Sequence, residues 1–388
     1  MTTKYRLMIP GPTPTPPQVA IAGALPLVDE RIPRFALLFA ELLDRLRLVF
    51  GTPEDVLVFA SSTTGAMESA IANLFSPGDR ILVVENGFFA ARWSAIARAY
   101  GVDVVVQAQP WGTTVDSAAV ARALAADPSI RAAVCVHCET STGAVSDLAA
   151  FGAATADVLS IVDAASSLGA CPVRAGENGL DVVVSGCQKA LMTPPGLSFV
   201  ALSGRAWRAQ EEARLPRFYF DWRTMKDALD HHGATPFTPA VGLIVQLDVA
   251  LRQLLQEGLE AVFARHVRLG RAVRAAVTTL GLSPLAGDDD AHAVVTAALL
   301  PPGVPAGPLA ATLLDEHGVQ VTTGNAGFAD RLIRIGHCGY VDRYDVVVAI
   351  AALEMALARA GHPVSPGAAV AAAQEAYGGA GLSAQVPA

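Results

Sequence analysis

The chain has 388 residues, of which 52% are hydrophobic and 16% charged, and its 28 Lys and Arg against 36 Asp and Glu give a net charge of −8. This acidic balance excludes the basic surface that nucleic-acid-binding proteins and proteins held on anionic membranes require. The length exceeds what a single core usually reaches, so we expect one large and one smaller domain acting on small molecules.

The amino-terminal segment 1–19 contains no apolar core of signal-peptide length, and no apolar run elsewhere approaches the roughly 18 residues of a membrane span. A cytoplasmic location is therefore predicted. The five cysteines are odd in number and mostly lie in or beside strand-like stretches, which favours reduced core thiols over disulfides. Cys135 and Cys138 form a C-x-x-C pair, but with no second pair or His-x-x-x-His we expect no metal site.

From about residue 50, apolar runs alternate with helical patterns, which is typical of strands joined by crossover helices in a parallel sheet. The predicted strands are 55–60, 80–85, 102–108, 131–137, 159–164, 180–186 and 197–203. The fold prediction is α/β, with a seven-stranded, mostly parallel sheet flanked by helices. Because such sheets bind ligands at the carboxyl ends of their strands, the residues just past these runs are the candidate site.

Beyond the sheet region, the proline- and aromatic-rich residues 216–225 are predicted to be irregular rather than helical. They lead into a long amphipathic segment from about Gly242 to Leu280, with a break near Gly258. A second unit follows, with predicted strands at 292–300, 319–324 and 331–337 and predicted helices at 309–318 and from Asp342 onward.

This organisation predicts a large domain at residues 15–250 and a smaller α+β carboxy-terminal domain at residues 251–388, preceded by an amino-terminal arm, residues 1–14. The Ala-rich segment from about Pro363 is predicted to be a terminal helix or a frayed end.

A turn that presents Ser62, Thr63, Thr64 and Gly65 follows the first strand and opens a helical pattern. The first amides of a helix have no intrahelical partner, so together with these hydroxyls they suit a phosphate group. The alternative is that Ser and Thr act only as helix N-caps.

The strand at 159–164 delivers Asp163, and the next one delivers Lys189 within the sequence SGCQKALMTPPGLS. Lys189 follows an apolar strand and precedes apolar residues, and burial lowers the pKa of an amine, which suits a nucleophile. A phosphate site, an acid and a buried lysine meet the needs of pyridoxal phosphate, whose aldehyde a lysine holds and whose ring nitrogen an acid keeps protonated. The alternative is a Lys189–Asp163 salt bridge with no catalytic meaning.

Eight segments in order resemble the class V, fold-type I pyridoxal-phosphate aminotransferases, in particular the alanine-glyoxylate, serine-glyoxylate and serine-pyruvate group. The segments are MIPGPTPTPP, STTGAMESAIANL, NGFFAARW, HCETSTGA, VDAASSLG, SGCQKALMTPPGL, TPFTPAV and RIGHCGYVDRYD. The resemblance implies that Lys189 is the Schiff-base lysine and the proton shuttle, and that Asp163 pairs with the pyridine nitrogen. It also implies that Phe89 stacks on the cofactor ring and that the hydroxyl of Thr140 approaches the pyridine 3-oxygen.

The same resemblance gives the phosphate ligands as Gln188 with the turn at Ser62, Thr63 and Thr64. Residues Thr238 and Thr235 match a segment that reaches the phosphate from the other subunit, which implies a homodimer.

Arg334 matches the family arginine that grips the substrate α-carboxylate, a task to which a planar guanidinium is suited because it can donate two parallel hydrogen bonds. Its alternative is a strand arginine that faces solvent. Gly11 matches a loop near the same carboxylate, which would bring the amino-terminal arm to the active site; an extended arm without that role is the alternative.

Two departures from the family pattern affect these expectations. Thr63 stands where relatives commonly have glycine, so the phosphate geometry is expected to differ. Glu30 precedes Arg31 where many relatives have histidine, near the substrate entrance, which leaves the amino donor open.

We expect an aminotransferase that moves an amino group from alanine or serine to glyoxylate or pyruvate in a ping-pong cycle. Only one carboxylate-binding arginine matches a motif, which favours short uncharged donors, although Arg31 or Arg217 could supply a second cation for aspartate or another donor. The alternatives are a lyase or desulfurase of the same fold, which would need a reactive cysteine such as Cys338, and a non-catalytic sensor.

Overall fold

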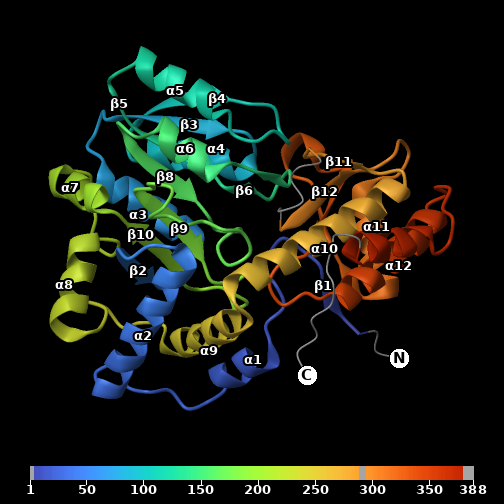
Figure 1. Cartoon of the computed structure of the whole chain (residues 1–388), viewed down its shortest axis with the longest axis horizontal. Coiled ribbons are helices and arrows are strands. Elements are labelled where there is room, and N and C mark those ends of the chain that lie inside the picture. The colour runs from blue at the N-terminus through green and yellow to red at the C-terminus, as the bar shows by residue number, and fades with distance from the viewer. Residues whose placement is uncertain (1–3, 288–293, 379–388) are drawn as a thin grey trace.

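The computed structural model describes residues 4–287 and 294–378 (Figure 1). Its largest element is a seven-stranded sheet in the order β2-β10-β9-β8-β5-β3-β4. The strands are β2 (Asp55–Phe59), β3 (Arg80–Glu85), β4 (Asp103–Ala108), β5 (Ile130–Val136), β8 (Leu159–Asp163), β9 (Val182–Gly186) and β10 (Ser198–Leu202). Each overlaps a predicted strand, with β5 starting one residue before the predicted one, so the predicted sheet is confirmed. β10 runs antiparallel to both of its neighbours, whereas the other pairings are parallel.

The sheet is the middle layer between two sets of helices, and each face has its own hydrophobic core. Val183 packs into the core that also contains Leu46 and Leu247, whereas its neighbours Val182 and Val184 pack into the opposite core. Strands buried on both faces read as continuous apolar runs, which is why the sequence predicted them. The helices of this region are α2 (Pro33–Phe50), α3 (Thr63–Leu74), α4 (Phe88–Ala99), α5 (Ser117–Ala126), α6 (Leu148–Ala154), α7 (Gly204–Glu212), α8 (Trp222–His232) and α9 (Val241–Glu257).

One prediction is wrong in this region, because residues 222–225 are the first turn of α8 rather than irregular chain. The Asp221 carboxylate accepts hydrogen bonds from the amides of Arg223 and Thr224 and so caps the helix. This N-cap outweighs the aromatic and proline content of the preceding residues.

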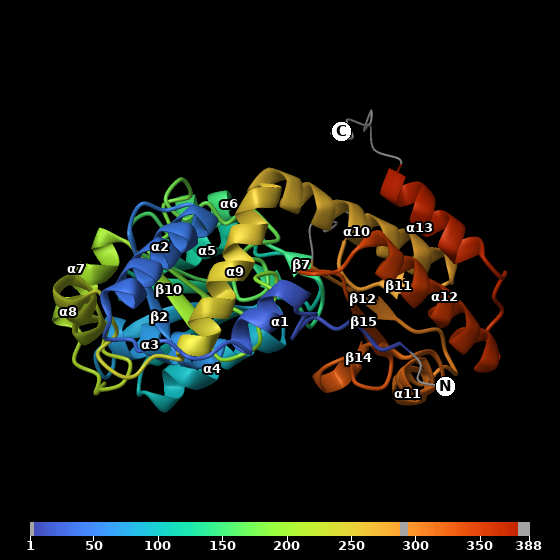
Figure 2. The same ribbon diagram turned by 90° about the horizontal axis from the view of Figure 1, so that it is seen from below.

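The carboxy-terminal part follows α10 (Leu259–Thr279), the long helix that Figure 2 shows running away from the large sheet. The predicted break is confirmed, since Gly258 separates α9 from α10 with φ +87°. Four antiparallel strands follow in the order β11-β12-β15-β14, and they pack with the helices against a third core. The elements are β11 (Ser283–Pro284), β12 (Val295–Leu299), α11 (Ala306–His317), β13 (Val319–Gln320), β14 (Thr322–Thr323), β15 (Leu332–Gly336), α12 (Arg343–Arg359) and α13 (Ala368–Gly378).

The predicted domain boundary at residue 250 falls inside α9, whose apolar side chains as far as Leu254 belong to a core of the large sheet; the division itself stays a prediction. The predicted terminal helix is α13, whereas residues 379–388 and the start of the predicted strand 292–300 lie outside the described residues. The first strand, β1 (Arg6–Leu7), pairs in parallel with β13. A short helix, α1 (Pro17–Gly23), and the hairpin β6 (Cys138–Glu139) with β7 (Ala144–Val145) complete the arrangement.

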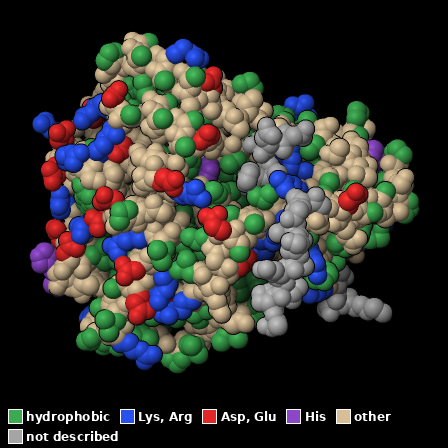
Figure 3. Space-filling view, viewed as in Figure 1, with side chains coloured by type: hydrophobic (Ala, Val, Ile, Leu, Met, Phe, Trp, Pro, Cys, Tyr) green, Lys and Arg blue, Asp and Glu red, His purple; other side chains and the backbone are tan. Residues whose placement is uncertain are grey.

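Charged side chains of both signs are intermingled on the face that Figure 3 shows. Within the described ranges, no helix combines the length and apolarity that crossing a membrane demands.

Candidate active site

A cavity of about 170 Å³ lies where β8 and β9 end and α3 and α4 begin. The predicted site residues that line it are Ser62, Thr63, Thr64, Phe89, Asp163, Gln188 and Lys189. Seven predicted side chains from four separate segments of the sequence therefore border one cavity.

Asp163 is the last residue of β8 and is only 4% exposed. Its carboxylate accepts hydrogen bonds from the indole Nε1 of Trp93 at 3.2 Å and from the amide of Ala165 at 2.9 Å. Burial raises the pKa of Asp163, and these two hydrogen bonds oppose that rise because they favour the ionised form. Trp93 is a residue that sequence reasoning missed.

Lys189 follows β9, and its Nζ donates a hydrogen bond of 2.8 Å to the backbone carbonyl of Pro10. Burial is the main cause that lowers the pKa of Lys189. Within the described part of the chain Lys189 forms no ion pair, so the alternative of a Lys189–Asp163 salt bridge is not realised. A buried amine that contacts a neutral carbonyl is available for covalent chemistry.

The amino-terminal arm packs directly on the lysine. Thr13 donates from its amide to the carbonyl of Gln188 at 3.0 Å and from its hydroxyl to the carbonyl of Lys189 at 2.6 Å. Gly11 has φ +143°, and a Cβ there would lie 2.4 Å from Cδ of Lys189, so only glycine fits. Gly11 therefore lies against the side chain of Lys189, and its predicted place near the substrate carboxylate stays a prediction.

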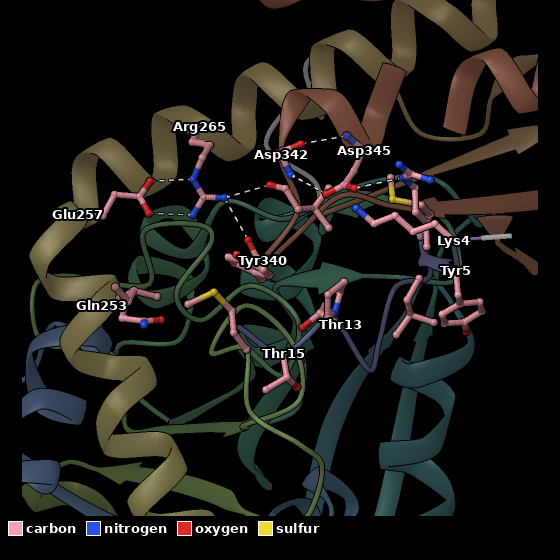
Figure 4. Close-up of a pocket in the computed structure, with 18 residues that line it drawn as sticks. Lys4, Tyr5, Thr13, Thr15, Gln253, Glu257, Arg265, Tyr340, Asp342 and Asp345 are labelled. Atoms are coloured by element: carbon pink, nitrogen blue, oxygen red, sulfur yellow. Dashed lines mark hydrogen bonds and ion pairs between the residues drawn. The ribbon is translucent and has the colours of Figure 1, made fainter. Parts of the chain in front are cut away.

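A separate, larger cavity of about 760 Å³ lies between the arm, α10 and the loop before α12 (Figure 4). There Arg265 forms an ion pair with Glu257 and donates to the backbone carbonyls of Gly339 and Val341. Neither Lys189 nor Asp163 lines this cavity, so its size does not make it the predicted site.

The turn before α3 presents hydroxyls that do not cap the helix. Ser62 is the N-cap residue but makes no side-chain capping bond, so the alternative of simple N-caps is not realised for it. The Oγ1 of Thr63 and the Oε1 of Gln188 are buried and have no hydrogen-bond partner among the described residues. The Thr63 hydroxyl can donate to a phosphate group at this helix amino terminus, and Gln188 can do so once its amide is turned to present the NH₂ group.

A Cβ at Gly186 would lie 2.2 Å from the Thr63 hydroxyl, so this glycine provides the room that the threonine takes up. The expected effect of Thr63 on the phosphate geometry stays a prediction.

Phe89 lies in the first turn of α4, beside an arginine that sequence reasoning missed. The guanidinium of Arg92 stands over the rings of Phe88 and Phe89, at 5.6 and 5.0 Å from their centroids, and donates to the Thr64 hydroxyl at 3.3 Å. Spacing of three and four residues on one helix could have indicated these contacts. The cavity therefore carries a second cation besides Lys189.

Arg334 on β15 contacts the turn that carries Thr140. Its guanidinium donates to the carbonyl of Thr140 at 3.3 Å and, through Nε, to the carbonyl of Thr323 at 2.9 Å. Burial lowers the pKa of Arg334, so the alternative of a solvent-facing strand arginine does not describe it.

Five predicted site residues do not line this cavity: Gly11, Thr140 and Arg334, whose contacts are described above, and Thr235 and Thr238. Thr235 and Thr238 line a different pocket with Tyr219 and Phe237, and the Thr235 hydroxyl donates to the carbonyl of Phe237 at 2.6 Å. Their predicted contact with a partner subunit's cofactor stays a prediction.

Two fully buried histidines predict how stability changes with pH. Burial lowers the pKa of both His266 and His337 to about 3, from an ordinary value of 6.5. Unfolding lets them take up protons below pH 6.5, so stability is complete above that pH and is lost as the pH falls toward 3. We expect a loss of about 1.4 kcal/mol per pH unit for each histidine in this window.

The check is the unfolding midpoint of the cofactor-free protein at about pH 7 and about pH 5.5. The variant His266→Asn should show a smaller midpoint change than wild type, whereas His231→Asn, at an exposed site on α8, should not. An unchanged pH dependence in His266→Asn would contradict the prediction.

Comparison with known proteins gives one family and one fold. Residues 30–346 match the family model described as Aminotransferase class-V. The chain is 39% identical to the L-aspartate--glyoxylate aminotransferase of Paracoccus denitrificans, with 97% of each chain covered. It is also 39% identical to the soluble hydrogenase 42 kDa subunit of Anabaena cylindrica, over 97% of this chain and 100% of that one. The crystal structure of ureidoglycine-glyoxylate aminotransferase from Bacillus subtilis superposes with a TM-score of 0.92 at 28% identity, covering 97% of this chain and 99% of that one.

Proposed function

The chain belongs to the class-V aminotransferases, and on that premise we propose that it moves an amino group from alanine or serine to glyoxylate or pyruvate in a ping-pong cycle. It is a transaminase that depends on pyridoxal 5′-phosphate. The observation that carries the proposal is the half-buried Lys189, which forms no ion pair within the described ranges and borders one cavity with Asp163.

When bound, pyridoxal phosphate supplies a ring that accepts the electrons left at the substrate Cα. Asp163, held by Trp93 and Ala165, offers a carboxylate that keeps a proton on the ring nitrogen. The Nζ of Lys189 would take the proton from the substrate Cα and deliver it to the C4′ carbon of the cofactor, and its lowered pKa suits that exchange near neutral pH.

We assign the phosphate to the Thr63 hydroxyl, which would donate to it, and to the side-chain amide of Gln188, which would turn its NH₂ group toward it, with Ser62 and Thr64 at the start of α3. Phe89 would stack on the ring, and Thr140 would hydrogen-bond to the 3-oxygen. A homodimer is proposed because Thr235 and Thr238 line a pocket apart from Lys189, as expected of residues that serve a partner subunit's site. We also propose a cytoplasmic location, supported by five buried cysteines without a disulfide.

Arg334 is proposed to bind the substrate α-carboxylate, with Gly11 close by. Replacement by glutamine is expected to lower kcat/KM for the amino donor by about 10- to 100-fold, because hydrogen bonds to a charged partner are worth about 1.5 to 3 kcal/mol. Steady-state kinetics with alanine and serine measure this loss. Arg331→Gln, a change of a neighbouring exposed arginine, is the control and should leave kcat/KM within about twofold; an equal loss in both variants would contradict the role.

The test of the function is the first half-reaction. Protein loaded with pyridoxal phosphate is mixed with single amino acids, and conversion to pyridoxamine phosphate is followed by absorbance. Alanine or serine should convert it, and glyoxylate or pyruvate should reverse the change. If aspartate alone converts the cofactor, the donor is wrong, and if no amino acid does, transamination itself is wrong.

A desulfurase is a less well supported hypothesis than an aminotransferase, because desulfurase chemistry requires an accessible, ionisable thiol. Cys338 is fully buried, and burial raises its pKa to about 11. It packs with Cys138, Cys171 and Ala190 rather than lying in a mobile loop. A serine replacement of Cys338 should therefore leave amino transfer in place.

A further inference from the structure

Glu139 is a buried carboxylate beside the cofactor cavity that none of the proposed roles uses. It lies in β6, next to Thr140, and is 0% exposed. Its Oε2 accepts from the amides of Phe89 and Ala90, each at 3.0 Å. Its Oε1 accepts from the amide of Ser141 at 3.0 Å and from the Ser141 hydroxyl at 2.6 Å. Both oxygens are thus fully engaged, and they join two segments 50 residues apart.

The amide contacts fall at the start of helix α4, where the backbone lacks intrahelical acceptors. The N-cap residue, Gly87, provides no side-chain cap, and the Ser141 hydroxyl accepts from the Phe88 amide at 3.1 Å. A negative charge at a helix amino terminus is favourable, and charge-assisted hydrogen bonds are roughly twice as strong as neutral ones. Glu139 and Ser141 therefore cap α4 from a distant turn.

The approach is close enough to dictate a neighbouring residue. A Cβ on Gly87 would lie 2.3 Å from Cγ of Glu139 and 2.7 Å from the Ser141 hydroxyl. Any larger side chain at position 87 would push the carboxylate away from the amides. Glycine is therefore required at position 87 because Glu139 and Ser141 leave no room for a Cβ, and not because of its backbone conformation.

The residues fixed in this way are the ones assigned to the cofactor and the substrate. The first turn of α4 carries Phe89, and the residue after Glu139 is Thr140, whose carbonyl accepts from Arg334. The Glu139 charge also stabilises the ionised form of Arg334, raising its pKa against the effect of burial. One carboxylate thereby sets the relative position of three site residues.

We propose that Glu139 is a positioning residue that holds Phe89 against the cofactor ring by capping α4. This inference rests on the proposed cofactor site. It assigns to Glu139 no contact with the substrate or with the reacting atoms.

The experiment is a double-mutant cycle on cofactor binding. The dissociation constant of pyridoxal phosphate and the visible circular dichroism per bound cofactor are measured for wild type, Glu139→Gln, Phe89→Ala and the double variant. Glutamine keeps the size but turns a donor toward the amides, so we expect about tenfold weaker binding and a reduced dichroic signal. In the Phe89→Ala background, Glu139→Gln should weaken binding by less than about threefold, because the part of its effect that passes through Phe89 is already lost and only the part that passes through Thr140 remains.

The matched control is Glu354→Gln. Glu354 is also a buried carboxylate that accepts backbone amides, those of Gly367 and Ala369 before and at the start of α13, away from the cavity. It should lower the melting temperature yet leave cofactor affinity and dichroism unchanged. Glu139→Asp serves if glutamine prevents folding: the shorter carboxylate should give an intermediate loss that Phe89→Ala again removes.

The inference would be overturned if the loss of cofactor affinity in the double variant equalled the product of the losses in the two single variants. An unchanged affinity in the folded Glu139 variants would overturn it as well. These results are separable from the proposed function. Wild-type protein that binds the cofactor but transfers no amino group refutes the function while the cycle can still be measured. Active wild-type protein with independent Glu139 and Phe89 effects refutes the inference alone.

Discussion

Replacing Lys189 by alanine is expected to lower the rate of amino transfer by about 10⁴-fold, the upper end of what general acid–base catalysis contributes. Of the three lysines in the chain, only Lys189 lines the cavity; Lys4 is exposed and Lys226 forms an ion pair with Asp230. No other lysine lines the cavity to move the proton at the substrate Cα. Single-turnover half-reactions with alanine or serine measure the loss.

Covalent attachment gives a second readout for Lys189. Borohydride reduction followed by intact mass measurement should add one cofactor to wild type and none to Lys189→Ala. The control Lys226→Ala removes a lysine on α8 and should retain both attachment and activity. Attachment that persists in Lys189→Ala would show that a different amine holds the cofactor and would contradict the site.

Replacing Asp163 by asparagine is expected to lower kcat by about 10²- to 10³-fold, a loss comparable to removing one preorganised electrostatic contact at a developing charge. Asparagine keeps the shape of the side chain but loses the charge that keeps a proton on the ring nitrogen. Rapid-reaction kinetics of the half-reaction measure this change separately from cofactor binding.

Trp93→Phe is the graded comparison for Asp163. It removes the 3.2 Å indole hydrogen bond while leaving the carboxylate and the bond from Ala165 in place, so its loss should be smaller than that of Asp163→Asn. A rate for Asp163→Asn within about threefold of wild type would rule out the proposed electrostatic role, since such a contact is worth far more.

The sequence predicted the large sheet well because its strands are buried on both faces. Continuous apolar runs such as 180–186 have one plausible structure between polar turns, and the strand ends then indicate where ligands bind. Asp163 and Lys189 could be recognised because each stands directly after such a run. The local sequence pattern was enough to predict these strands and strand ends, because burial on both faces of the sheet is visible within a few residues.

The contacts around those residues are long-range and leave no local pattern. Trp93 meets Asp163 across 70 residues, and Thr13 meets Lys189 across 176. Glu139 in the segment HCETSTGA has the pattern of an ordinary polar residue. Two of its four donors come from nearby Ser141, and only the packing of α4 against β6 supplies the other two, the amides of Phe89 and Ala90. Chain folding, rather than spacing in the sequence, creates these interactions.

The arm that covers Lys189 also has a consequence for the order in which the protein is assembled in the cell. Residues 4–13 are synthesised long before β13, the strand with which β1 pairs and in which Val319 lies opposite Arg6. The Met8 carbonyl likewise accepts a hydrogen bond from the amide of Gly336, which is synthesised later. The partners of the arm are therefore made only after more than three hundred further residues. The backbone bonds that anchor the arm can be complete only after residue 336 has been made, and a chain that stops earlier lacks a backbone partner of the arm that lies on Lys189.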